Sequence, residues 1–102
     1  MNLDVFFTPR SIAVVGASRT PGKVGHDVMV NISSSGYQGE IVAINPEADT
    51  LLGIPCYPDL QSYGKEVDLA IIVVPNEVAL KTVNDCINAG ARGIVVISSG
   101  FR

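Results

Sequence analysis

The chain has 102 residues, of which 47% are hydrophobic and 17% are charged, and its formal net charge at pH 7 is −3. This composition suits one globular domain and excludes a disordered chain. The acidic balance argues against a general nucleic-acid binder, and no apolar run is long enough to cross a bilayer. The N-terminal segment has an early Asp4 and no long apolar core, so it is not expected to be a secretory signal.

The first half of the chain predicts two strands joined by a helix. A short helical lead-in is expected at residues 3–7, before Pro9 stops it. The apolar run 11–16 predicts a buried strand, and the segment 24–35 predicts a helix because its apolar side chains recur every four residues. The run 40–45 predicts the second strand.

The second half of the chain continues this alternation. The third strand is expected at 51–57, and because it contains Pro55 it fits only at the edge of a sheet. The run 67–74 does not alternate apolar and polar residues, which favours a fourth strand covered on both faces. A helix should follow, with Asn76 as its N-cap, and the fifth strand is expected at 93–98.

Strands that alternate with helices imply right-handed crossovers and a mostly parallel sheet. We therefore expect the α/β class, with a Rossmann-like doubly wound sheet of strand order 3-2-1-4-5 that is truncated after strand 5. Residues 1–102 should form this single domain, as a fragment of a longer multidomain protein.

The segment GASRTPGKVG, residues 16–25, lies where such a sheet binds ligands, beyond the carboxyl ends of the strands. Gly16 allows a tight turn with positive φ, and the helix N-terminus that follows attracts anions. Arg19 and Lys23 add positive charge, and nearby hydroxyl groups add hydrogen-bond donors. The loop is predicted to bind phosphate. The alternative is an ordinary turn with solvated cations.

The spacing of the glycines departs from the known phosphate-binding motifs. The dinucleotide fingerprint G-x-G-x-x-G is not met by Gly16, Gly22 and Gly25, and no acidic residue stands at the tip of the second strand. The P-loop pattern also fails, because Val24 follows Lys23 where serine or threonine is required. An NAD-binding redox module remains as an alternative, and both departures count against it.

Three further strand ends could line the same site. Asn45–Pro46 could shape an adenosine pocket, or could be a simple turn. Val74–Pro75 could offer an apolar face to adenine, or could only end a strand and start a helix. Ser98–Ser99 places hydroxyl groups beside the first loop, with an ordinary turn as the equal alternative.

The sequence shows no catalytic set. His26 has no serine or acidic partner in sequence that would form a triad, and a lone helical histidine more often packs or faces solvent. Cys56 and Cys86 are thirty positions apart and make no metal-binding pattern, so we expect no metal site and two buried thiols in a reducing cytoplasm. By its own residues, the chain is a binding module.

Five segments together resemble a known family: LDVFFTPRSIAVVGAS, the NP after the second strand, GIPCYPDL, VDLAIIVVP and AGARGIVVISSGF. They are similar to the N-terminal CoA-binding domain of NDP-forming acyl-CoA synthetases, which include ADP-forming acetate–CoA ligases and the succinyl-CoA synthetase α subunit. The resemblance covers essentially the whole chain.

The resemblance implies that coenzyme A is the cofactor, with its phosphates in the first loop and the tail of the last strand completing the site. The positions that this implies are Gly16, Ala17, Ser18, Arg19, Thr20, Pro21, Ile97, Ser98 and Ser99. Lys23 and the pairs at 45–46 and 74–75 complete the candidate set.

Two departures from the succinyl enzymes bear on the branch of the family. Those enzymes carry an acidic residue where Ser99 stands, and a lysine shortly after the proline that matches Pro46, where this chain has Ala48. The departures fit the acetate branch better.

In this family an acyl-phosphate forms, and the phosphoryl group passes to a histidine of a following domain and then to ADP. The resemblance thus implies downstream histidine-carrying and ATP-grasp domains or a subunit as partners, and no catalysis by these 102 residues alone. A CoA-binding regulatory domain of a protein lysine acetyltransferase is the alternative, because the same domain opens those proteins. The acyl substrate, the choice of ADP or GDP and the oligomeric state stay open, and no nucleic-acid or membrane partner is expected.

Overall fold

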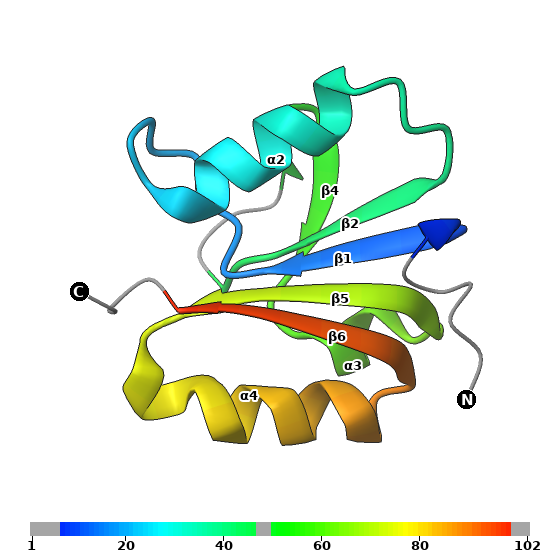
Figure 1. Ribbon diagram of the computed structural model, residues 1–102, viewed down its shortest axis with the longest axis vertical. Helices are drawn as coiled ribbons and strands as arrows, with labels where there is room; N and C mark the ends of the chain where they lie inside the picture. Colours follow the sequence, from blue (N-terminus) through cyan, green and yellow to red (C-terminus); the bar gives the residue numbers. More distant parts are fainter. Residues whose placement is uncertain (1–6, 47–49, 99–102) are drawn as a thin grey trace.

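The computed structural model describes residues 7–46 and 50–98. In chain order its elements are β1 (Ser11–Val15), α2 (Val24–Ser34), β2 (Glu40–Ile44), β3 (Thr50–Leu51), β4 (Ile54–Tyr57), α3 (Leu60–Tyr63), β5 (Val67–Val74), α4 (Asn76–Asn88) and β6 (Ala91–Ser98). Within the described residues, the strands form one sheet of order β3-β4-β2-β1-β5-β6. Helix α2 covers one face of this sheet, and α3 and α4 cover the other (Figure 1).

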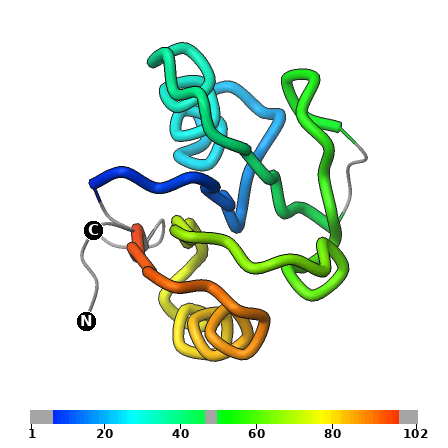
Figure 2. The backbone as a smooth tube through the Cα atoms, turned by 90° about the vertical axis from the view of Figure 1, so that its right-hand side faces the viewer, coloured from blue at the N-terminus to red at the C-terminus, as the bar shows by residue number. Residues whose placement is uncertain are grey.

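The sheet confirms the predicted fold class. The β2–β1, β1–β5, β5–β6 and β2–β4 pairs are all parallel, so the order β4-β2-β1-β5-β6 is the predicted 3-2-1-4-5. The end-on view shows the coil of α2 on one side of the strands and the coil of α4 on the other (Figure 2). This is a doubly wound α/β arrangement of the Rossmann type.

The predicted third strand is in fact two short strands. Leu52 and Gly53 both have positive φ, 53° and 76°, and turn the chain so that β3 pairs antiparallel with β4. Positive φ at both central residues is typical of a tight hairpin turn. The outer strand is therefore β3, and the expectation that the proline-bearing strand lies at the edge was wrong. Pro55 is tolerated because the pairing with β2 uses only Cys56 and Tyr57, beyond it.

Several boundaries also differ from the prediction. Helix α4 begins at Asn76 with Pro75 as its N-cap, so the cap lies one residue earlier than expected. Strand β6 begins at Ala91, two residues early, because Ala91 already pairs with Val67. Of the predicted lead-in helix only Phe7 lies within the described residues, and it is helical there.

Two apolar clusters hold the layers together. On the α2 face, Met29 is fully buried against β1 and β2. On the α3–α4 face, Cys86 and Leu60 pack against the centre of the sheet. Strand β5 is buried on both faces, as its lack of alternation predicts. No helix in the described part of the chain is both long and apolar enough to cross a lipid bilayer.

Candidate functional site

The carboxyl ends of the parallel strands meet at one edge of the sheet. There Val15 lies between Ile44 of β2 and Ile72 of β5, and the β1–α2 loop leaves from the centre of this edge. Because strand order reverses on either side of β1, this is the topological switch point at which such sheets bind ligands. The predicted loop therefore lies where the sequence placed it.

Gly16 fixes the start of the loop. Its φ is +92°, and a Cβ at this position would overlap the carbonyl oxygen of Val73. Its amide N–H donates a hydrogen bond of 3.1 Å to the carbonyl oxygen of Ile44. Only glycine combines this backbone conformation with so close an approach to β5.

Gly25 allows the first turn of α2 to pack against the backbone of Gly16. It is buried, and a Cβ here would overlap the carbonyl oxygen of Gly16. In the dinucleotide fingerprint the third glycine allows this kind of close helix packing. Gly16 and Gly25 thus perform the same packing with a longer loop between them, which explains why the spacing departs from the fingerprint.

The loop between these glycines is braced by short hydrogen bonds. The Thr20 amide donates to Oγ of Ser18 at 3.0 Å, and the Lys23 amide donates to the carbonyl oxygen of Thr20 at 3.2 Å. The carbonyl oxygen of buried Ala17 accepts a bond of 2.8 Å from Nδ2 of Asn45. The loop is therefore a defined shape, tied to the end of β2.

The N-terminus of α2 is suited to hold an anion. Its N-cap residue, Lys23, makes no side-chain capping bond. The first amides of a helix have no intrahelical acceptor, and the helix dipole adds positive potential there. Arg19 in the loop and Lys23 at the helix start are both exposed. Backbone donors and two exposed cations thus belong to one short segment.

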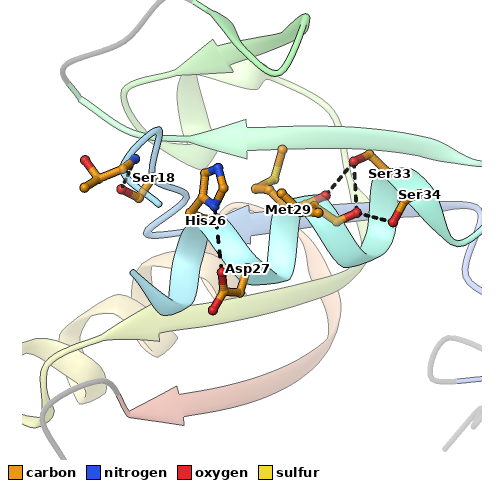
Figure 3. Close-up of polar contacts among 8 residues, drawn as sticks. Ser18, His26, Asp27, Met29, Ser33 and Ser34 are labelled. Atoms are coloured by element: carbon orange, nitrogen blue, oxygen red, sulfur yellow. Dashed lines mark hydrogen bonds and ion pairs between the residues drawn. The ribbon is translucent and has the colours of Figure 1, made fainter. Parts of the chain in front are cut away.

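His26 belongs to the packing of this helix. Its side chain is only 17% exposed, and Nδ1 lies 3.8 Å from Oδ1 of Asp27, too far for a hydrogen bond. Figure 3 shows the imidazole in the first turn of α2, with the Asp27 side chain beside it. Farther along the helix, the Ser33 and Ser34 hydroxyls donate to backbone carbonyls of the preceding turn. In the described residues, no group of three or more potential ligands is placed to hold a metal ion.

The remaining predicted positions are only partly brought together. Asn45 contacts the loop directly, and Pro46 and Pro75 are exposed at the same edge. Val74 is half-buried and packs against the core on the α4 face.

The last strand, β6, is not a neighbour of β1, from which the loop leaves. Ile97 pairs with Val73, and Ser98 pairs with Val74, so β5 lies between these residues and β1. Ser99 lies outside the described residues.

Sequence reasoning missed a cavity of about 390 Å³ on the other face of the sheet, between α3 and α4. Its walls include Val15, Ile44, Pro58, Leu60, Thr82 and Cys86. The last residues of β1 and β2 meet the single turn of α3 and the side of α4 around this cavity. The only sequence signal for this cavity was that residues 59–66 can form one helical turn at most.

Comparison with known proteins gives a consistent result. A sequence model of a family described as CoA binding domain matches residues 10–102. The chain is 43% identical over 98 residues to acetate–CoA ligase (ADP-forming) II of Archaeoglobus fulgidus, covering 96% of this chain and 14% of that protein. It is 41% identical over 100 residues to the α subunit of acetate–CoA ligase (ADP-forming) II of Pyrococcus furiosus, covering 97% of this chain and 21% of the subunit.

A solved structure agrees with these relatives. The apo form of the dinucleotide-forming acetyl-coenzyme A synthetase 1 of Candidatus Korarchaeum cryptofilum superposes with a TM-score of 0.92 at 44% identity. The match covers 98% of this chain and 22% of that chain. The chain therefore spans only a small part of the length of each of these proteins.

Proposed function

The chain belongs to the CoA binding domain family, and we propose that it holds the phosphates of coenzyme A in the β1–α2 loop and at the N-terminus of α2. The observation that carries this proposal is the stacking of Gly25 on Gly16, which places the uncapped start of α2 against the loop. Backbone amides there can donate to phosphate oxygens without the aid of a metal ion.

Charge supports the same placement. The chain as a whole carries a net charge of −3, so a highly anionic ligand gains nothing from a global field. Arg19 and Lys23 are exposed beside the helix start and add charge-assisted contacts, while Ser18 and Thr20 add hydroxyl donors. Ala17 and Pro21 shape the loop. The tail of β6, with Ile97, Ser98 and Ser99, completes the site in this proposal.

The ligand is CoA rather than NAD, and Asn45 supports this choice. An NAD site places an acidic residue at the tip of the second strand to bind the ribose hydroxyls. Here that tip carries Asn45, and its Nδ2 is bonded to the carbonyl oxygen of Ala17. The side chain is therefore committed to the loop and leaves no carboxylate for a ribose.

Residues 1–102 form one CoA-binding domain of a longer protein, an ADP-forming acyl-CoA synthetase of the acetate branch. The relatives reported above are named as ADP-forming acetate–CoA ligases, which favours a synthetase over a lysine acetyltransferase. In such a protein the histidine-carrying and ATP-grasp domains, or a second subunit, perform the chemistry, and this domain binds CoA. Cys56 and Cys86 are free thiols, which suits a reducing cytoplasm.

Calorimetric titration of the purified chain with CoA, dephospho-CoA, NAD and ATP tests this function. We expect CoA to bind more tightly than NAD and ATP, and dephospho-CoA to bind more weakly than CoA because it lacks the 3′-phosphate. Tighter binding of NAD than of CoA would contradict the proposal.

A further inference from the structure

His26 carries a buried polar atom that has no partner. Its side chain is only 17% exposed, and Nδ1 is buried without a hydrogen bond to any group in the described part of the chain. The nearest carboxylate oxygen, Oδ1 of Asp27, lies 3.8 Å away, beyond bonding distance. Unpaired buried polar atoms are rare in folded proteins, so one beside a proposed binding loop needs a physical explanation.

The unpaired atom selects one form of the imidazole ring. A neutral imidazole carries its proton on one nitrogen and a lone pair on the other. A buried N–H without an acceptor is tolerated less than a buried lone pair, so the favoured form has its proton on Nε2. Figure 3 shows Nδ1 on the side of the ring that faces Asp27, with the second nitrogen on the far side. His26 therefore presents one N–H donor, directed away from Asp27.

This donor belongs to the turn of α2 at which the phosphates are proposed to bind. Lys23 is the N-cap, so His26 is the third residue of the helix. Helical side chains lean toward the N-terminus and cover the turn that precedes their own Cα. The imidazole thus covers the first turn of the helix, where Figure 3 shows it.

The backbone amides of the same turn are only partly used. The amides of His26 and Asp27 both donate to the carbonyl oxygen of Lys23, at 3.1 Å each. Within the described residues, the amides of Val24 and Gly25 have no acceptor. An anion at this turn can therefore meet two backbone donors together with the imidazole N–H.

We propose that His26 donates a hydrogen bond from Nε2 to a phosphate oxygen of the bound ligand, beside the amides of Val24 and Gly25. The inference rests on the proposed function, because a phosphate must first lie at the start of α2. The unpaired Nδ1 then has a role: without an acceptor there, the proton stays on the nitrogen that the ligand needs. A half-buried ring also loses less conformational freedom on binding than the exposed side chains of Arg19 and Lys23.

Two substitutions separate the donor from the packing of the ring. His26→Phe keeps a flat ring of similar size and removes the N–H, whereas His26→Gln can place its amide nitrogen near the position of Nε2. In calorimetry with CoA at pH 8, we expect His26→Phe to weaken binding by about fivefold or more and His26→Gln to stay within about twofold of the unmodified chain. Unchanged affinity in His26→Phe, or equal losses in the two variants, would overturn the inference.

Nitrogen NMR of the unmodified chain does not depend on how the variants fold. His26 is the only histidine of the chain, so its ring signals need no assignment by mutation. A two-bond ¹H–¹⁵N spectrum at pH 8 should show the proton on Nε2, and saturating CoA should shift Nε2 while Nδ1 stays unprotonated. A proton on Nδ1 in the free chain, or ring signals that CoA leaves unmoved, would contradict the proposed bond.

Phosphorus NMR identifies the group that accepts the bond. At saturating CoA, at least one phosphorus signal of the bound ligand should differ between His26→Phe and the unmodified chain, and His26→Gln should restore it. Identical phosphorus signals in all three proteins would show that the ring does not contact a phosphate.

Arg19→Ala distinguishes failure of this inference from failure of the proposed function. If Arg19→Ala weakens CoA and His26→Phe does not, the phosphates bind at the loop and His26 only packs. If the unmodified chain binds no CoA, the proposed function fails, and the role of His26 fails with it.

Discussion

The α-carbon of Gly16 lies so close to the carbonyl oxygen of Val73 that no side chain fits between the loop and β5. Gly16 also has a φ of +92°, a conformation that residues with a Cβ rarely adopt. Through this contact the β1–α2 loop is held against the neighbouring strand at the point where the phosphates of the ligand are proposed to bind.

Replacing Gly16 therefore tests how the loop is held. Gly22 is the matched control, because its φ is +93° but a Cβ there would meet nothing within 4 Å. We expect Gly22→Ala to lower the free energy of unfolding by about 1 kcal/mol through backbone strain alone. Gly16→Ala should lower it by more than about 3 kcal/mol, because overlap with fixed backbone is added. Urea unfolding measures both, and equal losses would contradict the close approach.

Asn45 should contribute to both stability and binding. Its Nδ2 donates to the Ala17 carbonyl oxygen at 2.8 Å, so Asn45→Ala removes one hydrogen bond and lowers the unfolding free energy by about 1 kcal/mol. Asn45→Asp should destabilise more, because it places a carboxylate against that carbonyl. Both variants should weaken CoA in calorimetry. If Asn45→Asp is as stable as the unmodified chain, the bond from Asn45 to the Ala17 carbonyl oxygen does not hold the loop.

The two cations of the loop should matter for affinity rather than for folding. We expect Arg19→Ala and Lys23→Ala each to weaken CoA about fivefold or more, which corresponds to about 1 kcal/mol, because each removes a charge-assisted phosphate contact. Lys65→Ala serves as the control, since Lys65 lies beside the Tyr63 ring after α3. Unchanged affinity in both loop variants would refute the phosphate assignment.

Tyr63 should titrate unusually late. Burial and a hydrogen bond to Glu40 raise its pKa to about 12. Because the folded pKa lies above the unfolded value of about 10, the stability that this phenol contributes is complete below pH 10 and is lost as the pH rises toward 12.

Ultraviolet absorbance at 295 nm can isolate this group. The titration of the unmodified chain minus that of Tyr63→Phe should show one phenol with a midpoint near pH 12. The same difference measured with Tyr37→Phe separates the two phenols, because burial also raises the pKa of Tyr37. A midpoint near pH 10 for Tyr63 would argue against the burial of its hydroxyl.

The sequence predicted most of the fold because the signals were local. The non-alternating run at 67–74 indicated a central strand, and the glycine at 16 indicated the turn into α2. One feature of the fold depended on a backbone conformation that a linear pattern does not reveal. The hairpin of β3 and β4 depends on Leu52 in a left-handed conformation, and propensity does not favour such a conformation for leucine.

The sequence singled out the β1–α2 loop as a candidate phosphate site because glycines and cations cluster there after an apolar run, and the binding role of its residues stays a prediction. The cavity between α3 and α4 could not be found, because Thr82 and Gln61 are far apart in sequence and meet only through the packing of the two helices. The packing role of Gly25 was likewise visible only once the helix lay against Gly16.

Amide chemical shifts recorded during a titration of the ¹⁵N-labelled chain with CoA test the central claim most directly. We predict saturable changes that are largest for the amides of residues 16–20 and 22–25, at the loop and the start of α2. Saturable binding that leaves these amides unmoved, or the absence of any binding, would contradict the account.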